Sequence, residues 1–182
     1  MCIRDRFVPG IGDIGCMVSK ETAGRYFDLQ LTREAKRLHP NLLFLGEIKR
    51  ENDFEGGSPI GRIRQGDTEA DDYLLDDSSL AYTSSQGLVV IAGCAHAGIC
   101  NTVNQAMRVC DKGRLVDIIG GFHLLDPPRR QLTRTVEQMA AWQPTTLHAC
   151  HCTDLNSKVA LVGVAPMKDT GVGLSLHFDP MP

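Results

Sequence analysis

Aromatic residues, excess positive charge and long apolar runs are all scarce in this sequence of 182 residues. Aromatic residues make up 5% of the chain, which disfavours a stacking platform for single-stranded nucleic acid. The formal net charge of -3 argues against a large surface for a phosphate backbone. No run approaches the roughly 18 to 20 apolar residues that a membrane helix needs, and no basic segment followed by an apolar signal core begins the sequence. We therefore expect a cytoplasmic protein with no nucleic-acid and no membrane partner.

The cysteines are too few, and odd in number, for a secreted disulfide scaffold. Of the 7 cysteines, four lie within four residues of His96 or His151: Cys94, Cys100, Cys150 and Cys152. This clustering favours reduced thiols near a functional site. The alternative for each of them is a small, buried, apolar side chain.

The first part of the chain gives weak structural signals. Met1 to Arg6 form no recognisable element, and we expect them to be a non-native leader that is left out of the fold. Residues 7–32 are expected to be loop, and Asn41 to Ile48 a buried strand. Residues Glu51 to Asp77 are rich in glycine and acids, which predicts a long surface excursion. Its acidic end is expected to be a solvated loop, with Asp71, Asp72, Asp76 and Asp77.

From Ser79 onward, strand and helix patterns alternate. Apolar residues recur at helical spacing in the first predicted helix, and two adjacent prolines begin the second. The predicted elements are strands Ser79–Thr83 and Leu88–Ala92, helix Gly98–Asp111, strand Leu115–Ile119, a helix from Pro127 and Pro128, strand Thr145–Ala149, helix Asn156–Val162 and strand Val172–Phe178. The order β-β-α-β-α-β-α-β predicts a layered α/β fold.

Three histidines each follow a predicted strand, at His96, His123 and His151. Each loop leads from a strand toward a helix, so all three should open on the edge of the sheet where α/β proteins bind ligands. Neutral imidazoles there suit zinc, iron or manganese. A single such histidine is more often a surface or hydrogen-bonded residue, but three at equivalent positions predict a metal site.

The other three histidines are not expected to bind the metal, and the cysteines offer an alternative site with His96. We expect His39 and His177 to be structural, and His148 to point elsewhere along its strand. Cys150 and Cys152 alternate along the chain and would face opposite ways if extended, which favours the three-histidine site. The alternative is a structural Cys3His zinc site, made by Cys94, His96, Cys150 and Cys152.

Three ordered segments carry a family resemblance. They are GLVVIAGCAHAGICNTV at 87–103, IIGGFHLL at 118–125 and HCT at 151–153. These segments resemble the C-terminal motifs of metallo-β-lactamase-fold hydrolases. More narrowly, they are similar to the subgroup of dihydropterin ribofuranosyl-aminobenzene phosphate synthase-like proteins. The likeness runs from roughly residue 41 to residue 178, and it implies the C-terminal part of an αββα sandwich.

The resemblance also implies roles for single residues. His96 matches a metal ligand, and His151 matches the late histidine ligand. His123 lies where many relatives have a bridging aspartate, so we expect a catalytic acid/base residue or a further ligand. The implied cofactor is a divalent metal, zinc first, with manganese or iron as alternatives. Other residues expected to line the site are Cys94, Gly121, Cys152 and Asp154, the last in place of the family's glycine after HCT.

The HxHxDH motif of this fold, which supplies most ligands of the first metal, does not occur in the sequence. We therefore expect residues 7–182 to be a single truncated domain that carries about half of a metal site and has little activity alone. The implied function is metal-dependent hydrolysis, or a related transfer. The implied substrate is a small molecule, and phosphorylated compounds are among the candidates. One alternative is a non-catalytic structural zinc or interaction module. Another is a nucleotide-binding α/β protein, which no Gly-rich phosphate loop supports.

Overall fold

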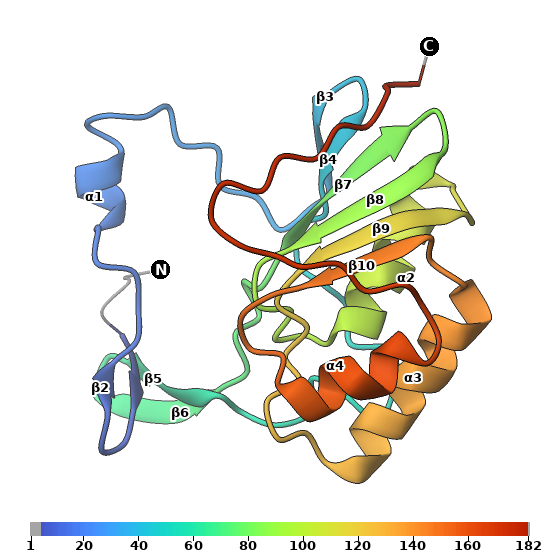
Figure 1. The fold of residues 1–182 in the computed structure, drawn as a ribbon. Helices are drawn as coiled ribbons and strands as arrows, with labels where there is room; N and C mark the ends of the chain where they lie inside the picture. The colour runs from blue at the N-terminus through green and yellow to red at the C-terminus, as the bar shows by residue number, and fades with distance from the viewer. Residues whose placement is uncertain (1–4, 182) are drawn as a thin grey trace.

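The computed structural model describes residues 5–181, which form a large helix-backed sheet and a smaller sheet beside it (Figure 1). The large sheet has six strands in the order β10-β9-β8-β7-β4-β3. Its strands are β3 (Lys36–His39), β4 (Leu42–Phe44), β7 (Ser79–Ser84), β8 (Gly87–Ala92), β9 (Leu115–Gly120) and β10 (Thr146–Ala149). The helices that pack with it are α2 (Ile99–Cys110), α3 (Arg129–Trp142) and α4 (Leu155–Val162). None of the helices within residues 5–181 is long and apolar enough to cross a membrane.

Strands β8, β9 and β10 are parallel, whereas β3, β4 and β7 are joined to their neighbours in antiparallel fashion. The helix α2 connects β8 to β9, and α3 connects β9 to β10. Because successive right-handed crossovers that advance in one direction lie on one face of a sheet, both helices cover the same face. This arrangement brings the carboxyl ends of β8, β9 and β10 to one edge.

The core lies between this face and the helices. Ile118 and Leu147 from the sheet and Ile99 and Val103 from α2 are all fully buried in one cluster. The predicted alternation of strands and helices from Ser79 to Val162 is confirmed, with element ends that shift by a few residues.

The predicted closing strand Val172–Phe178 is wrong. This C-terminal segment has no strand pairing of its own and crosses the sheet, as the red trace in Figure 1 shows. Single bridges join Leu147 to Met167 and Ser84 to Pro180. A segment that runs across the strands instead of along an edge cannot build a ladder of hydrogen bonds, although its alternating apolar residues are typical of a strand.

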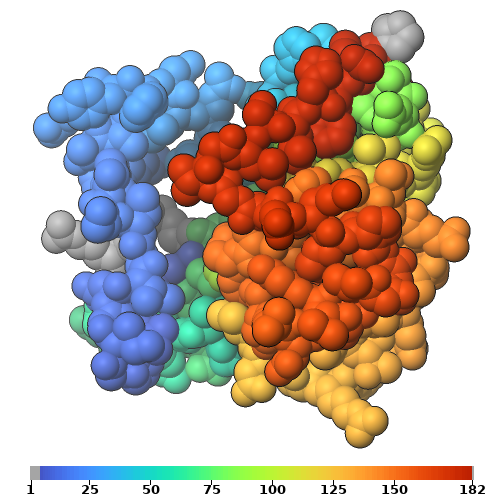
Figure 2. Space-filling view, viewed as in Figure 1, coloured from blue at the N-terminus to red at the C-terminus, as the bar shows by residue number. Residues whose placement is uncertain are grey.

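The smaller sheet has four strands in the order β2-β1-β5-β6. It contains β1 (Arg6–Val8), β2 (Gly12–Asp13), β5 (Gly61–Gln65) and β6 (Thr68–Asp72), and the short helix α1 (Lys20–Ala23) follows β2. The prediction of loop for residues 7–32 is therefore wrong, and the surface excursion predicted for residues 51–77 contains the two strands β5 and β6. Arg6, predicted to lie outside any element, begins β1, while residues 1–4 of the predicted leader lie outside the described residues. Figure 2 shows the N-terminal segment standing apart from the main body.

The acidic stretch before β7 is also more structured than predicted. Asp72 is buried, and its carboxylate lies 3.0 Å from Nε of Arg6, whose Nη1 is 2.6 Å from Asp76. Asp77 is turned inward, with 7% of its side chain exposed. Sequence could not indicate this, because the basic partner Arg6 is about 70 residues away along the chain.

Candidate metal centre

The loops after β8, β9 and β10 are hydrogen-bonded to one another at the carboxyl edge of the large sheet. The N–H of Gly121 donates to the carbonyl of Gly93 at 2.8 Å, and the N–H of Cys150 donates to the carbonyl of Gly120 at 2.9 Å. These bonds continue the parallel ladder beyond the ends of the strands. The three histidine-bearing loops therefore meet at one edge, as the strand order predicts.

Two cysteines and one histidine gather between these loops. Sγ of Cys94, Nε2 of His151 and Sγ of Cys152 all lie within 4.8 Å of one another, and the first two are 2.8 Å apart. We call these three residues the Cys2His cluster. Within the described part of the chain, Cys150 and His96 lie outside it. The four residues of the predicted Cys3His site are therefore not all brought together.

Gly121 leaves the space that this cluster occupies. A Cβ atom at that position would lie 2.5 Å from Sγ of Cys152 and 2.9 Å from Nε2 of His151. Any side chain there would displace the cluster. The predicted place of Gly121 beside the site thus has a steric reason.

His96 and His123 form a second group next to the cluster. Their rings meet edge to face, with centroids 4.9 Å apart and an interplanar angle of 88°. The carboxylate of Asp77 lies 3.9 Å from Nδ1 of His96 and accepts a hydrogen bond of 2.9 Å from the N–H of Ala97. We call His96 and His123 the histidine pair. Sequence reasoning missed Asp77, since nothing in the acidic run distinguishes it from its neighbours.

Burial sets the protonation of both groups. It lowers the pKa of His96 and of His123, an effect that the nearby Asp77 carboxylate opposes. Both imidazoles are therefore neutral at neutral pH, the form that binds a metal or accepts a proton. Burial raises the pKa of the Cys94 thiol, and it raises the pKa of Cys152 to about 11. Because the thiolate is the ligand, metal binding to these sulfurs must release protons.

The histidine pair lines a cavity of about 340 Å³. Residues 52–58 and Ile60 also line it, together with Pro128 and Gln131 at the start of α3. The amide of Gln131 donates to the carbonyl of His123 at 3.5 Å. The cavity is large enough for a small-molecule ligand, and two neutral imidazoles face it.

Glu55 joins the cavity wall to the loop that carries His96. Its carboxylate accepts hydrogen bonds from the N–H groups of Cys100, at 3.2 Å, and Asn101, at 2.6 Å, in the first turn of α2. A Cβ on Gly98 would lie 2.1 Å from Cδ of Glu55. Burial raises the pKa of Glu55 despite these hydrogen bonds. Sequence reasoning missed this residue, which caps a helix more than 40 positions further along the chain.

Two other polar residues lie outside both groups. The partly buried Asp154 caps α4, its carboxylate accepting from the N–H of Ser157 at 2.7 Å and from the N–H of Asp126 at 2.6 Å. These backbone hydrogen bonds lower the pKa of Asp154. His148 is buried, and its Nδ1 lies 2.8 Å from the carboxylate of Asp117 on β9. Asp154 thus serves a helix terminus, and His148 lies within the sheet.

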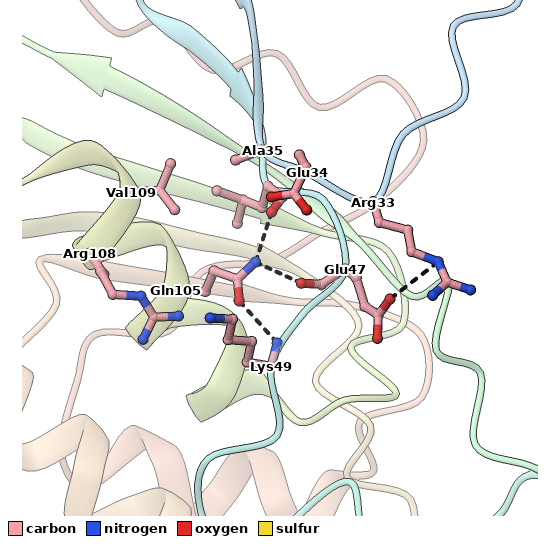
Figure 3. A pocket seen from close by; sticks show the side chains of 9 residues that line it. Arg33, Glu34, Ala35, Glu47, Lys49, Gln105, Arg108 and Val109 are labelled. Carbon is pink, nitrogen blue, oxygen red and sulfur yellow. Dashed lines mark hydrogen bonds and ion pairs between the residues drawn. The ribbon is translucent and has the colours of Figure 1, made fainter.

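A second cavity, of about 330 Å³, lies on the outer side of α2 and is shown in Figure 3. Its centre is Gln105, whose amide donates to the carbonyls of Leu45 and Glu47 and accepts from the N–H of Lys49. These bonds tie α2 to the segment after β4. The cavity is lined by no residue of the Cys2His cluster or the histidine pair.

Comparison with known proteins places this geometry in a recognised fold. No family model matches the chain. The chain is 29% identical over 132 residues to 7,8-dihydropterin-6-methyl-4-(β-D-ribofuranosyl)-aminobenzene-5'-phosphate synthase of Methanocaldococcus jannaschii, covering 70% of this chain and 45% of that protein. It is 26% identical over 142 residues to the uncharacterized protein MJ0448 of the same organism, covering 78% and 52%. The chain thus spans about half the length of the curated relatives it matches.

A solved structure gives the same result for the fold. Tm1679, a metal-dependent hydrolase of the β-lactamase superfamily, superposes with a TM-score of 0.73 at 24% identity. The match covers 84% of this chain and 59% of Tm1679. The chain therefore has a metallo-β-lactamase-like fold, and its sequence is similar to that of a dihydropterin ribofuranosyl-aminobenzene phosphate synthase.

Proposed function

We propose that this chain supplies one side of a metal-dependent active site that hydrolyses a small molecule or carries out a related transfer. The observation that carries the proposal is the neutral histidine pair, which faces a cavity of about 340 Å³ directly beside the Cys2His cluster. The similarity to a metal-dependent hydrolase and to a synthase supports the same function class.

The donor atoms at this edge fit a divalent metal. Imidazole nitrogen and cysteine sulfur are preferred ligands of zinc, whereas carboxylate and water oxygens suit manganese or magnesium better. We therefore propose zinc as the metal, in one or two positions. His151 is a ligand at the Cys2His cluster, and His96 is a ligand on the side of the histidine pair. When bound, such an ion would polarise the substrate and lower the pKa of a water molecule.

Other residues of the chain are proposed to act on the substrate and on the metal ligands. His123 is neutral and faces the cavity, so it can accept or donate a proton at the substrate. The carboxylate of Asp77 lies 3.9 Å from Nδ1 of His96 and favours the protonated form of that ring electrostatically. The substrate we propose is a small molecule. We propose a phosphorylated one because the name of the similar synthase contains a 5'-phosphate group.

We further propose that efficient catalysis needs metal ligands beyond those of this chain. The Cys2His cluster offers three protein ligand atoms, and the histidine pair lies beside it. Water would fill the remaining coordination positions. We expect slow turnover, far below the roughly 10 s⁻¹ that is the median for enzymes.

Turnover of generic phosphoester and lactone substrates with added zinc or manganese tests the proposal. The expected result is slow, chelator-sensitive hydrolysis that falls in His123→Ala and is retained in His177→Ala, which changes an exposed histidine of the C-terminal segment. Hydrolysis that persists at the same rate after chelation would contradict metal dependence. Chelator-sensitive turnover at ordinary enzyme rates would contradict the proposed need for further ligands.

A second candidate function is a structural zinc module, and the Cys2His cluster favours it. Structural zinc sites are closed by four protein ligands, whereas catalytic ones keep an open position. The cluster has three members and its histidine is exposed to solvent, which supports the catalytic function. Metal analysis of His96→Ala and Cys152→Ala separates the two. Loss of metal together with unfolding in the cysteine variant alone would favour the structural module.

A further inference from the structure

We infer that Cys94, Cys152 and His151 together bind one zinc-like ion through two thiolates and one imidazole, with the fourth position open to water or substrate. The inference rests on the proposed function only in that a metal binds at this sheet edge. It assigns two ligands, Cys94 and Cys152, that the family resemblance does not supply. His96 and His123 then act on the cavity and do not hold this ion.

The distances in the cluster suit a tetrahedral ion. Zinc bonds of about 2.3 Å to sulfur and about 2.0 Å to nitrogen place neighbouring ligand atoms roughly 3.3 to 3.8 Å apart. The three ligand atoms of the cluster lie within 4.8 Å of one another, and Sγ of Cys94 is 2.8 Å from Nε2 of His151. Side-chain shifts of about 1 Å, well within rotamer adjustment, would complete the site.

The backbone around the cluster is fixed independently of any ion. The carbonyl of Cys152 accepts from the N–H of Leu124 at 2.7 Å, and the hydroxyl of Thr153 accepts from the N–H of Phe122 at 3.1 Å. Cys152 has a φ of 45°, a left-handed conformation that is strained for a residue with a side chain. These hydrogen bonds hold it there, so its thiol points at the same place as that of Cys94.

The solvent exposure of the cluster and the chemistry of its ligand atoms determine which ions can bind. Cys94 and Cys152 are half-buried while His151 is exposed, so the cluster is open to solvent on one side. That opening provides an entry path and a free coordination position. Two sulfurs and a nitrogen favour zinc, cobalt and other borderline or soft metals, and they disfavour calcium, magnesium and manganese.

Cobalt substitution of the full chain tests this assignment under reducing conditions. Thiolate ligands give Co(II) a sulfur-to-metal charge-transfer absorption, and a tetrahedral site gives strong visible bands. We expect both in the parent chain. We expect the charge-transfer absorption to weaken in Cys94→Ser and Cys152→Ser, to vanish in the double variant, and to persist in the matched control Cys150→Ser and in His96→Ala.

Alkylation of the unmodified chain gives a second measurement that needs no variant to fold. Added zinc should slow the alkylation of Cys94 and Cys152 by iodoacetamide, because a thiolate that binds the metal is not free to react, and it should leave the exposed Cys16 reactive. Metal binding without a thiolate signal, or alkylation of Cys94 and Cys152 that added zinc leaves unchanged, would overturn the inference and leave the proposed function standing. Absence of any metal binding would overturn both.

Discussion

The part of the chain after Ser79 and the part before it are built differently. In the later part, Phe122, Ile118 and Leu147 are completely buried in one core. In the earlier part, Leu45 and Ile48 join the same core, but the N-terminal segment, residues 5–38, leaves large apolar side chains on the surface, with Met17 93% exposed and Phe27 69% exposed. The later part therefore has its own source of stability, whereas the N-terminal segment buries too little apolar area to contribute much.

The candidate site contains residues from both parts of the chain. The Cys2His cluster and the histidine pair all belong to the well-packed part, directly after its parallel strands. Asp77 and Glu55 come from the earlier part, and they contact the loop and the first helical turn that follow β8. The ligands therefore lie on a well-packed base, and the cavity wall is attached to it by the polar contacts of Glu55 and by the packing of Phe54 against the core.

The largest expected effect separates the two parts directly. Phe122→Ala removes a fully buried ring between the site loops, and it should lower the free energy of unfolding by about 3 to 5 kcal/mol. Phe27→Ala, at the exposed ring, should change it by less than about 0.5 kcal/mol. Urea denaturation followed by circular dichroism measures both. Similar losses in the two variants would show that the N-terminal segment is packed as tightly as the main sheet.

A smaller effect is expected where the two parts touch. Gly98→Ala forces a side chain onto Glu55 at a residue with φ of 100°, and it should cost about 1 to 3 kcal/mol. Gly57→Ala is the matched control, because an added Cβ there meets nothing within 4 Å. Thermal unfolding of both variants measures the difference. If Gly98→Ala unfolds at the parent's temperature, Glu55 does not hold the start of α2.

The smallest effect is a pH dependence that Glu55 should impose. Burial raises the pKa of Glu55 above the ordinary value of 4.5. Between pH 4.5 and the folded-state pKa, the folded state therefore binds more protons than the unfolded state. The contribution to stability is complete below pH 4.5 and is lost as the pH rises through the folded pKa. Urea unfolding of the parent and Glu55→Gln between acidic and neutral pH should show their difference in stability, parent minus variant, falling with pH. A rising difference would mean that hydrogen bonds to the ionised form dominate.

The periodic spacing of apolar residues predicted the elements of the well-packed part, because an element that buries one face must carry apolar residues at that spacing. The helix predicted at Gly98–Asp111 is observed at Ile99–Cys110, since one apolar face must meet the sheet. The hairpin of β5 and β6 escaped prediction because its strands are held by backbone pairing and by surface contacts such as Arg62 with Asp71, at 3.1 Å. Such strands carry no apolar alternation that a sequence pattern could detect.

The site was predictable in part for the same reason. Strand order places His96, His123 and His151 at one edge, and the structure has their loops there. Which side chains then meet depends on turns that sequence does not fix. The left-handed backbone at Cys152 and the missing Cβ of Gly121 bring two sulfurs to His151. The prediction that three imidazoles gather stays untested as a ligand set.

The most direct test of the central claim is the zinc affinity of the full chain, measured by competition with a chromophoric chelator, for the parent, His151→Ala and His177→Ala. His151 is the histidine of the Cys2His cluster, and His177 is an exposed residue of the C-terminal segment. We predict that His151→Ala weakens zinc binding by on the order of tenfold or more, while His177→Ala matches the parent. Equal zinc affinity in all three chains would contradict a metal centre at this edge of the sheet.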